Sequence, residues 1–315
     1  MPKYKASAPK SQLERAGEQK LKNERVLPFI REYLTEAGGH NFERCGSFIE
    51  FFANYDLTKL KVFRADFCRN RFCPMCQMRH SAKEAMKASL MVDWIKDVHK
   101  KEFIFLTLTV PNVAAIDLDD KIKQMGDAFK LMFKLKQVKA MNHGYIRKLE
   151  VTYNKKANTY HPHFHVLVPV DRGYFSGGRY ISQAKWLDIW RDVMEDWSIT
   201  QLDVKRIYGE KGASEVAKYS AKSEDYTHSQ EVFRIFYQTL KGKRVLSYGG
   251  LFKEASALHK TGGLDIYKTV DEEQYVWRYV VTWANDFYQK YKLTEMSQQE
   301  YQELRQEAVD ETAVF

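Results

Sequence analysis

The stretch YHPHFHVLVPV, residues 160–170, places His161, His163 and His165 at alternating positions of a segment that otherwise has the composition of a buried strand. The whole chain contains nine histidines. Because successive side chains of a strand point to opposite faces, the three histidines share one face and Phe164 lies on the other. Burying three imidazoles without a purpose would be costly, so the pattern predicts a site on one face of a sheet and a core on the other.

The preceding segment, YIRKLEVTY at residues 145–153, is joined to this strand by the short polar stretch NKKANT at 154–159. Two strands joined by so short a turn must be antiparallel. Further strands are expected at 102–110 and 199–209, with helices between them. The expected fold is therefore α+β, an antiparallel sheet with helices packed on it, rather than a doubly wound parallel sheet.

The turn also suggests a register for the two strands. If Asn154 lies opposite Thr159, then Glu150 lies opposite His163. Directly opposed side chains are about 5 Å apart at Cβ, whereas a slip of one residue would turn Glu150 to the other face. The register thus decides whether a carboxylate joins the histidines.

With this register, His163, His165 and Glu150 are predicted to form a three-ligand metal site with open positions. His161 precedes a proline and either flanks this site or holds the strand edge. Manganese or magnesium suits two imidazoles and a carboxylate, and zinc is also compatible. An open site of this kind indicates Lewis-acid chemistry on a phosphoryl or carbonyl oxygen.

The composition favours a basic globular protein. The chain has 315 residues and a formal net charge of +9, which is typical of a nucleic-acid partner but also of a merely basic soluble protein. No apolar stretch is long enough for a transmembrane helix, and the charged N-terminal sequence does not resemble a signal peptide, so a cytoplasmic protein without membrane contact is expected.

Four regions are expected along the chain. They are a disordered basic tail at 1–10, a helical and zinc-binding segment at 11–100, a catalytic domain at 101–260, and a helical C-terminal region with an acidic tail at 261–315.

The four cysteines of the chain are Cys45, Cys68, Cys73 and Cys76. In a cytoplasmic protein, metal binding is a better interpretation than disulfides, and the C-P-x-C sequence is typical of a zinc site. We predict one structural zinc bound by all four thiolates. His80 is an alternative to Cys45, and four unrelated reduced thiols remain the competing interpretation.

Basic residues follow the cysteine cluster and recur at 241–244. Such runs are usually solvated faces, but here they are candidates for contacts with the phosphates of DNA. The candidates are Arg69, Arg71, Arg79, Lys241, Lys243 and Arg244.

The stretch EVAKYSAK, residues 215–222, would place Glu215, Tyr219 and Lys222 on one face of a helix. Taken alone, the pattern is weak, because similar triplets occur on many solvated helices. Beside a metal site it gains meaning, because a cation and a lysine would favour the phenolate of Tyr219. Attack by that phenolate on a phosphodiester would give a phosphotyrosine link.

Three motifs together carry a resemblance to a known family. FLTLTVPN at 105–112, HPHFHVLV at 161–168 and EVAKYSAK at 215–222 resemble, in order and spacing, the motifs of rolling-circle plasmid replication initiators of the HUH endonuclease superfamily. The subfamily with one tyrosine and a nearby glutamate is the most similar. The resemblance covers residues 40–260, and it implies an antiparallel, ferredoxin-like HUH sheet.

The resemblance also implies roles for particular residues. His163 and His165 resemble the metal pair, and Tyr219 resembles the nucleophile that nicks one strand at the origin, keeps the 5′ phosphate and releases a 3′ hydroxyl. Glu215 resembles the general base that activates water for a terminating hydrolysis. Lys222 resembles a lysine that contacts the phosphate or the metal site.

The partners that the resemblance implies are double-stranded origin DNA, single-stranded DNA, a host helicase and a single-strand binding protein, all in a bacterial cytoplasm. A homodimer is left open. Two rival functions remain at this point: a transposase or conjugative relaxase with the same chemistry, and a non-catalytic, zinc-stabilised origin-binding protein.

Overall fold

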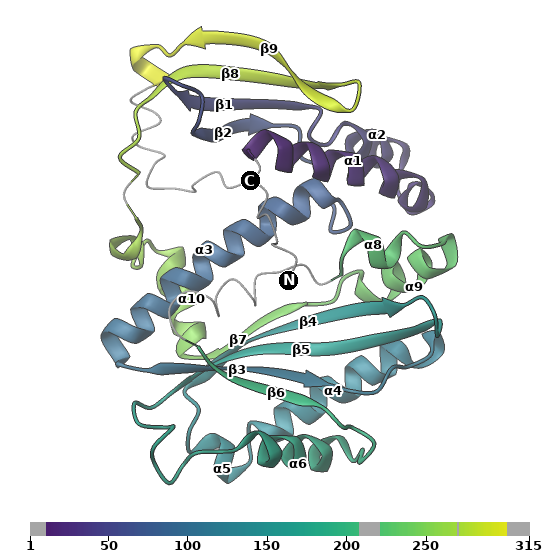
Figure 1. Cartoon of the computed structure of the whole chain (residues 1–315), viewed down its shortest axis with the longest axis vertical. Helices are drawn as coiled ribbons and strands as arrows, with labels where there is room; N and C mark the ends of the chain where they lie inside the picture. The colour runs from purple at the N-terminus through teal and green to yellow at the C-terminus, as the bar shows by residue number, and fades with distance from the viewer. Residues whose placement is uncertain (1–10, 208–220, 270, 301–315) are drawn as a thin grey trace, which may run out of the picture. The chain divides into compact units, whose positions relative to one another are not determined.

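A computed structural model describes residues 11–207, 221–269 and 271–300 (Figure 1). The expected disordered tail at 1–10 lies outside these described residues. No helix in the described ranges is long and apolar enough to cross a membrane.

The chain divides into two compact units. One comprises Met1–Lys83 with Val270–Phe315, and the other comprises Glu84–Thr269. We refer to them as the cysteine unit and the histidine unit, after the clusters that they contain.

The cysteine unit is built on a four-stranded antiparallel sheet in the order β2-β1-β8-β9. Its strands are β1 (Phe48–Asn54), β2 (Leu60–Ala65), β8 (Tyr275–Ala284) and β9 (Phe287–Glu295). Its helices are α1 (Gln12–Ile30), the 3-10 helix η1 (Arg31–Tyr33), α2 (Glu36–Arg44) and the first part of α3 (Pro74–His99).

The helical character expected for 261–315 is wrong for the segment that forms β8 and β9. These strands are joined by Asn285 and Asp286, both in the left-handed region with φ of 54° and 64°. A two-residue turn of this kind joins hairpin strands, and Asn and Asp tolerate its backbone geometry. The alternation of aromatic and polar residues around the turn was the signal for a hairpin.

The C-terminal hairpin is tied to the first strand by a buried ion pair. Glu50 on β1 is 1% exposed and lies in ion pairs with Arg278 on β8 and with Arg64 on β2, the latter at 3.1 Å. Because an unpaired buried carboxylate would be very costly, these arginines compensate its charge within the sheet.

The histidine unit contains a five-stranded sheet in the order β6-β3-β5-β4-β7, with every neighbouring pair antiparallel. The strands are β3 (Glu102–Thr109), β4 (Gly144–Asn154), β5 (Thr159–Val170), β6 (Leu202–Ile207) and β7 (Leu246–Gly250). The helices are η2 (Ala115–Asp117), α4 (Leu118–Met132), α5 (Lys136–Lys139), α6 (Gln183–Met194), α8 (Ser223–Tyr226), α9 (Gln230–Leu240), α10 (Leu251–Lys260) and η3 (Asp265–Tyr267). The predicted α+β class with an antiparallel sheet is confirmed.

Helices cover both faces of this sheet (Figure 1). On one face, Phe129 of α4 meets Phe164 edge to face at 6.0 Å, and the indole nitrogen of Trp190 on α6 donates to the carbonyl of Thr109 at 2.8 Å. On the other face, the second part of α3 and α10 pack on Phe105 and Leu167. This second face also carries the histidines of β5, which lie further along the strands than the row of Phe105 and Leu167.

The turn between β4 and β5 fixes their register. The Oδ1 atom of Asn154 accepts hydrogen bonds from the backbone nitrogens of Lys156 and Ala157 at 3.1 and 3.2 Å, and Asn158 adopts a left-handed φ of 51°. Asn154 therefore pairs with Thr159, as predicted from the sequence. Because the side-chain period of a strand is two, this turn decides which residues of β4 face the histidines.

The edge between β4 and β7 depends on a glycine. Gly144 has a φ of +134°, and a Cβ placed there would clash with the carbonyl oxygen of Gly249. We expect Gly144→Ala to lower the free energy of unfolding by about 1–3 kcal/mol or more, since the backbone would have to shift. Urea unfolding followed by circular dichroism measures this change.

The matched control is Gly126→Ala in α4, where an added Cβ meets nothing within 4 Å. Because alanine favours a helix interior by about 0.5–1 kcal/mol, this variant should be as stable as the parent or more so. Equal stability of the Gly144 and Gly126 variants would contradict the close approach of β4 and β7.

Candidate functional site

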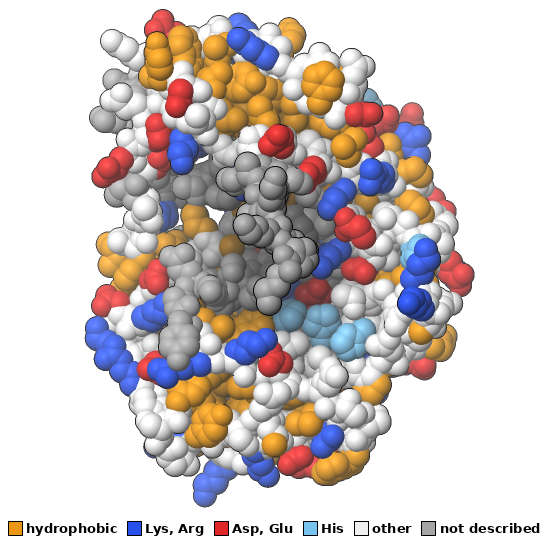
Figure 2. All heavy atoms as spheres, viewed as in Figure 1, with side chains coloured by type: hydrophobic (Ala, Val, Ile, Leu, Met, Phe, Trp, Pro, Cys, Tyr) orange, Lys and Arg blue, Asp and Glu red, His pale blue; other side chains and the backbone are white. Residues whose placement is uncertain are grey.

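The sheet of the histidine unit places polar side chains in two adjacent rows on one face. His163 lies between Thr109 on β3 and Glu150 on β4. His165 lies between Thr107 on β3 and Lys148 on β4 in the neighbouring row. Figure 2 shows histidine side chains gathered over this sheet.

Glu150, His163 and His165 converge at one point. The Nε2 atoms of His165 and His163 lie 3.1 and 3.7 Å from Oε2 of Glu150. One ligand atom from each of the three residues falls within 4.8 Å of the others. The predicted register, with Glu150 opposite His163, is confirmed, and the three residues fit a divalent cation with two nitrogen ligands and one oxygen ligand.

The site is electrostatically prepared for a cation. Burial of Glu150 favours the neutral acid, but hydrogen bonds and charge interactions with His163 and His165 outweigh it and hold the pKa of this carboxyl well below its usual range. Glu150 is 9% exposed and His163 is 8% exposed, so a charged carboxylate is held in a largely dry position.

Neighbouring groups orient the imidazoles. Nδ1 of His163 lies 3.3 Å from the carbonyl oxygen of His161, which can only accept, so Nδ1 is placed to donate there while Nε2 faces Glu150. His165 stacks on Phe105 with ring centroids 5.5 Å apart, and its Nδ1 lies 3.5 Å from the hydroxyl of Thr107. Such support holds metal ligands in place.

His161 does not join the group of ligand atoms. Its ring stacks beside that of His163, with centroids 5.2 Å apart, and it lines a shallow pocket with Asn112 and Tyr153. The prediction that His161 flanks the site agrees with this position.

Two polar residues beside the site were missed in the sequence. Lys148 is 5% exposed and shares the face of Glu150, which the period of two along β4 could have shown. Asp225 on α8 accepts from the backbone nitrogen of Tyr153 at 3.5 Å, and burial, with the charge of Glu150 as a smaller contribution, raises the pKa of its carboxyl. No sequence pattern pointed to Asp225.

The tyrosine motif is described only in part. Glu215 and Tyr219 lie outside the described residues. Lys222 is described: it is exposed, and its extended backbone, with φ −81° and ψ 149°, caps the start of α8. Lys222 was predicted to lie in a helix with Glu215 and Tyr219, but its own backbone is not helical. Its position is set by α8, which contacts β4.

The four cysteines converge in the cysteine unit. The Sγ atom of Cys45 lies 3.4 Å from Sγ of Cys73 and 3.6 Å from Sγ of Cys76. The Sγ atoms of Cys68 and Cys76 are 3.7 Å apart. Zinc–sulfur bonds of about 2.3 Å place the sulfurs of a tetrahedral site roughly 3.8 Å apart. The group therefore fits one four-thiolate ion, and His80, the alternative ligand, is not part of it.

A cation would also resolve the electrostatics of this cluster. Burial and the neighbouring sulfurs raise the pKa of the Cys73 thiol well above its usual value, and a bound cation would oppose that shift. Backbone nitrogens of Cys68 and Arg69 donate to Sγ of Cys45 and Cys76 at 3.4 and 3.2 Å. These donors suit charged thiolates.

A buried lysine lies beside the cluster and was also missed in the sequence. Lys20 on α1 is 1% exposed, and its ammonium donates to the carbonyl oxygen of Glu43 at 2.6 Å. Asn23, one turn further, donates to Sγ of Cys73 at 3.3 Å. Burial lowers the pKa of Lys20, while nearby anionic groups, including Cys45 and Cys73, oppose that shift.

The candidate DNA-binding residues fall in both units. In the cysteine unit, Arg69 and Arg71 are exposed, and the guanidinium of Arg79 lies over the ring of Phe67 at 4.6 Å. In the histidine unit, Lys241 and Arg244 are exposed, whereas Lys243 forms an ion pair with Asp119 at 2.5 Å. Lys243 is therefore already neutralised by a carboxylate.

The fold and these two clusters define a class: an α+β protein with an open histidine–carboxylate site on an antiparallel sheet and a closed cysteine site in a separate unit. The family model described as "Replication protein" (Rep_1) matches residues 59–300. The chain belongs to this replication protein family, and its identification with rolling-circle plasmid replication initiators is confirmed.

Relatives of this family include proteins named "Protein rep". One from Staphylococcus aureus is 45% identical over 68% of this chain and 95% of its own length. Others, from Streptococcus pneumoniae and Bacillus amyloliquefaciens, are 39% and 33% identical over 71% and 74% of this chain, and over 71% and 77% of their own lengths. No solved structure matches the chain significantly.

The histidine cluster generates a prediction about metal binding. We expect the full-length protein to bind one Mn²⁺ ion in addition to zinc, and Glu150→Gln and His165→Ala each to weaken that binding by about tenfold or more, because each removes a ligand. Electron paramagnetic resonance of free Mn²⁺ measures the affinity. His99→Ala, which changes a histidine outside both clusters, should bind as the parent does.

The cysteine cluster generates a second prediction. A zinc ion with four thiolates carries a net charge of −2, and Lys20 is the buried cation beside it. We therefore expect Lys20→Met to weaken zinc binding by about tenfold or more, measured as zinc released to a chromogenic chelator. Arg25→Met removes an equal charge from the exposed side of α1 and should have no effect; equal zinc retention in both variants would exclude the role of Lys20.

Proposed function

We propose that the protein is a metal-dependent, origin-specific DNA nickase and strand-joining enzyme that initiates plasmid rolling-circle replication. The observation that carries the proposal is the convergence of Glu150, His163 and His165 on the open part of an antiparallel sheet, in a chain of the replication protein family. The order of the sheet, with the histidine strand at its centre, supports an HUH-type domain at 101–260.

The proposed nucleophile is the hydroxyl of Tyr219. Its oxygen forms a bond to the scissile phosphorus, and the bond from phosphorus to the 3′ oxygen breaks, so that the protein keeps the 5′ phosphate and releases a 3′ hydroxyl. A divalent cation held by Glu150, His163 and His165 would polarise the scissile phosphate and stabilise its developing charge. Lys222, exposed at the start of α8, would contact the phosphate.

Termination would use a second residue of the same motif. Glu215 would accept a proton from water, which attacks a phosphodiester in place of a second tyrosine. The product of that step is a hydrolysed strand rather than a second covalent adduct. The initiator is thereby released from the DNA.

Phosphate contacts would position the DNA without reading its sequence. The proposed residues are Arg69, Arg71, Arg79, Lys241, Lys243 and Arg244, of which Lys243 would first have to leave Asp119. Double-stranded origin DNA, single-stranded DNA, a host helicase and a single-strand binding protein are the proposed partners in the bacterial cytoplasm. A homodimer at the origin is compatible with the same scheme.

The proposal is tested by nicking of a supercoiled plasmid that carries the replicon encoding this protein. With Mn²⁺ present, the parent protein should open the plasmid and remain linked to a 5′ phosphate through Tyr219. Tyr219→Phe should reduce nicking to background because the phenol oxygen is the attacking atom. Gel analysis of relaxed circles and mass spectrometry of the phosphotyrosine peptide measure the two outcomes.

Tyr180→Phe is the control, since Tyr180 is an exposed tyrosine outside the motif. Glu215→Ala should still nick but leave more protein trapped on DNA. If Tyr219→Phe nicks as fast as the parent, the nucleophile is assigned wrongly; if the parent itself never nicks, a non-catalytic origin-binding protein is favoured.

A further inference from the structure

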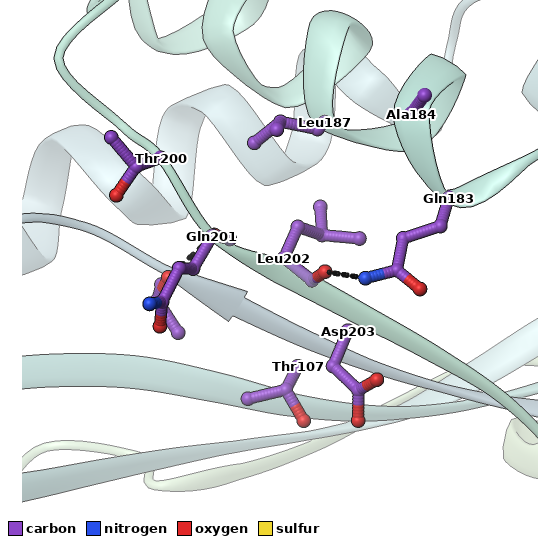
Figure 3. Close-up of a pocket in the computed structure, with 9 residues that line it drawn as sticks. Thr107, Gln183, Ala184, Leu187, Thr200, Gln201, Leu202 and Asp203 are labelled. Carbon is purple, nitrogen blue, oxygen red and sulfur yellow. Dashed lines mark hydrogen bonds between the residues drawn. The ribbon is translucent and has the colours of Figure 1, made fainter.

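A pocket of about 630 Å³ lies beside the histidine site, at the β6 edge of the same sheet (Figure 3). Its lining residues are Thr107, Thr109, Gln183, Ala184, Leu187, Thr200, Gln201, Leu202 and Asp203. The volume is typical of a ligand site and exceeds what one water or ion needs. All these residues belong to the histidine unit.

The pocket and the metal-type site share a wall. Thr107 lines the pocket, and its hydroxyl lies 3.5 Å from Nδ1 of His165. Asp203 is the cross-strand partner of Thr107 and therefore shares the face of His165, two strands away. Two strand spacings are roughly 10 Å, so a group in the pocket lies about one nucleotide from a phosphate at the histidines.

The lining suits the edge of a base and not a phosphate. Among the described residues no Lys or Arg lines the pocket, whereas Asp203, Gln201 and Thr200 offer a carboxylate, an amide and a hydroxyl. A carboxylate facing DNA repels phosphates, so its presence here needs a donor as its partner. Exocyclic amino groups of bases are such donors, and Asp and Glu accept from them in base recognition.

The apolar part of the lining lies on the α6 side of β6. Leu187 and Ala184 of α6 and Leu202 of β6 supply it, and Leu202 and Asp203 point to opposite sides of the strand (Figure 3). The pocket therefore reaches round the edge strand, from the polar face with Asp203 to the apolar side chains under α6. Within the described ranges no aromatic side chain lines the pocket, so stacking, which is tolerant of sequence, would not dominate. Hydrogen bonds to the base edge would then decide which base is accepted.

The pocket is also held rigidly. The side-chain amide of Gln183 donates to the carbonyl of Leu202 at 2.8 Å, and the hydroxyl of Thr109 donates to the carbonyl of Gln201 at 2.7 Å. Arg191 donates to the carbonyl of Ile199 at 2.7 Å and so fixes the loop before β6. A rigid surround favours selective recognition over adaptable binding.

Asp203 has a partner that DNA can replace. Its carboxylate forms an ion pair with Lys205 at 2.5 Å, and the Lys205 side chain is 67% exposed. A phosphate of the bound strand would attract the ammonium of Lys205, and a base amino group would take its place at Asp203. After this exchange Lys205 is paired with a phosphate and Asp203 accepts a hydrogen bond from the base, so neither charged group is left without a partner.

We propose that this pocket binds the base of a nucleotide next to the scissile phosphate, and that Asp203 selects a base with an exocyclic amino group over thymine. The proposal deepens the proposed function, since it rests on single-stranded DNA crossing the histidine site. Asp203 is thus a specificity-determining residue of the nicking reaction.

The test measures binding rather than cleavage, so that it stays readable if nicking fails. The full-length Tyr219→Phe protein is titrated, by fluorescence anisotropy with Mn²⁺, with labelled single-stranded oligonucleotides that tile the non-coding region of its own replicon. Each position of the best-bound oligonucleotide is then replaced by each of the four bases and by an abasic site.

We expect one position at which an amino-bearing base binds about tenfold more tightly than thymine or an abasic site. Asp203→Ala in the same background should reduce that difference to about twofold or less. Asp192→Ala, which removes an exposed carboxylate from α6 outside the pocket, should preserve it.

Three outcomes would overturn the proposal: no binding of any oligonucleotide, no position with a base preference, or a preference that survives Asp203→Ala. If Asp203→Ala does not fold, Leu187→Trp fills the pocket from α6 instead. This variant should bind the preferred oligonucleotide no better than the abasic one, and an unchanged preference would again reject the pocket. Nicking by the parent protein, measured separately, reports on the proposed function alone.

Discussion

The register between β4 and β5 is the constraint on which the histidine site depends. Asn154 closes the turn with its own side chain, and the pairing that follows brings Glu150 opposite His163. A slip of one residue would leave two imidazoles without a carboxylate and would put Glu150 among the apolar residues under α4. The same antiparallel alignment, continued through β3 and β6, sets Thr107 and Asp203 beside the histidines.

The two clusters solve different electrostatic problems. In the cysteine unit, four sulfurs surround one point, so an ion there would have no free position and would hold together the end of α2, the segment after β2 and the start of α3. Lys20 and backbone donors balance the negative charge of that cluster. In the histidine unit, three ligands leave positions open, and the surrounding surface is a pocket rather than a core. Only the second arrangement can admit a substrate oxygen.

The histidine face of the sheet changes from apolar to polar along its strands. The rows that contain Phe105 and Leu167 are covered by α3 and α10. The next rows carry Thr107, His165 and Lys148, where helix cover gives way to the pocket beside β6. The other side of the sheet packs its apolar residues under α4 and α6 and also carries Arg147, which lies over the rings of Phe129 and Phe164. The fold thus keeps a core on that side while a polar strip stays open on the histidine side.

The sequence alone determined the hairpin, its register and therefore the convergence of Glu150, His163 and His165, because period-two alternation and a short polar turn are local properties of the chain. The helical expectation is wrong after residue 260, where Asn285 and Asp286 join two strands and the first of these pairs with β1. Tertiary structure alone decided the positions of Lys20, Asp225 and Asp203, because each approaches its cluster from a different element. Contacts between elements far apart in the chain depend on how those elements pack, and packing does not produce a periodic pattern within any one segment.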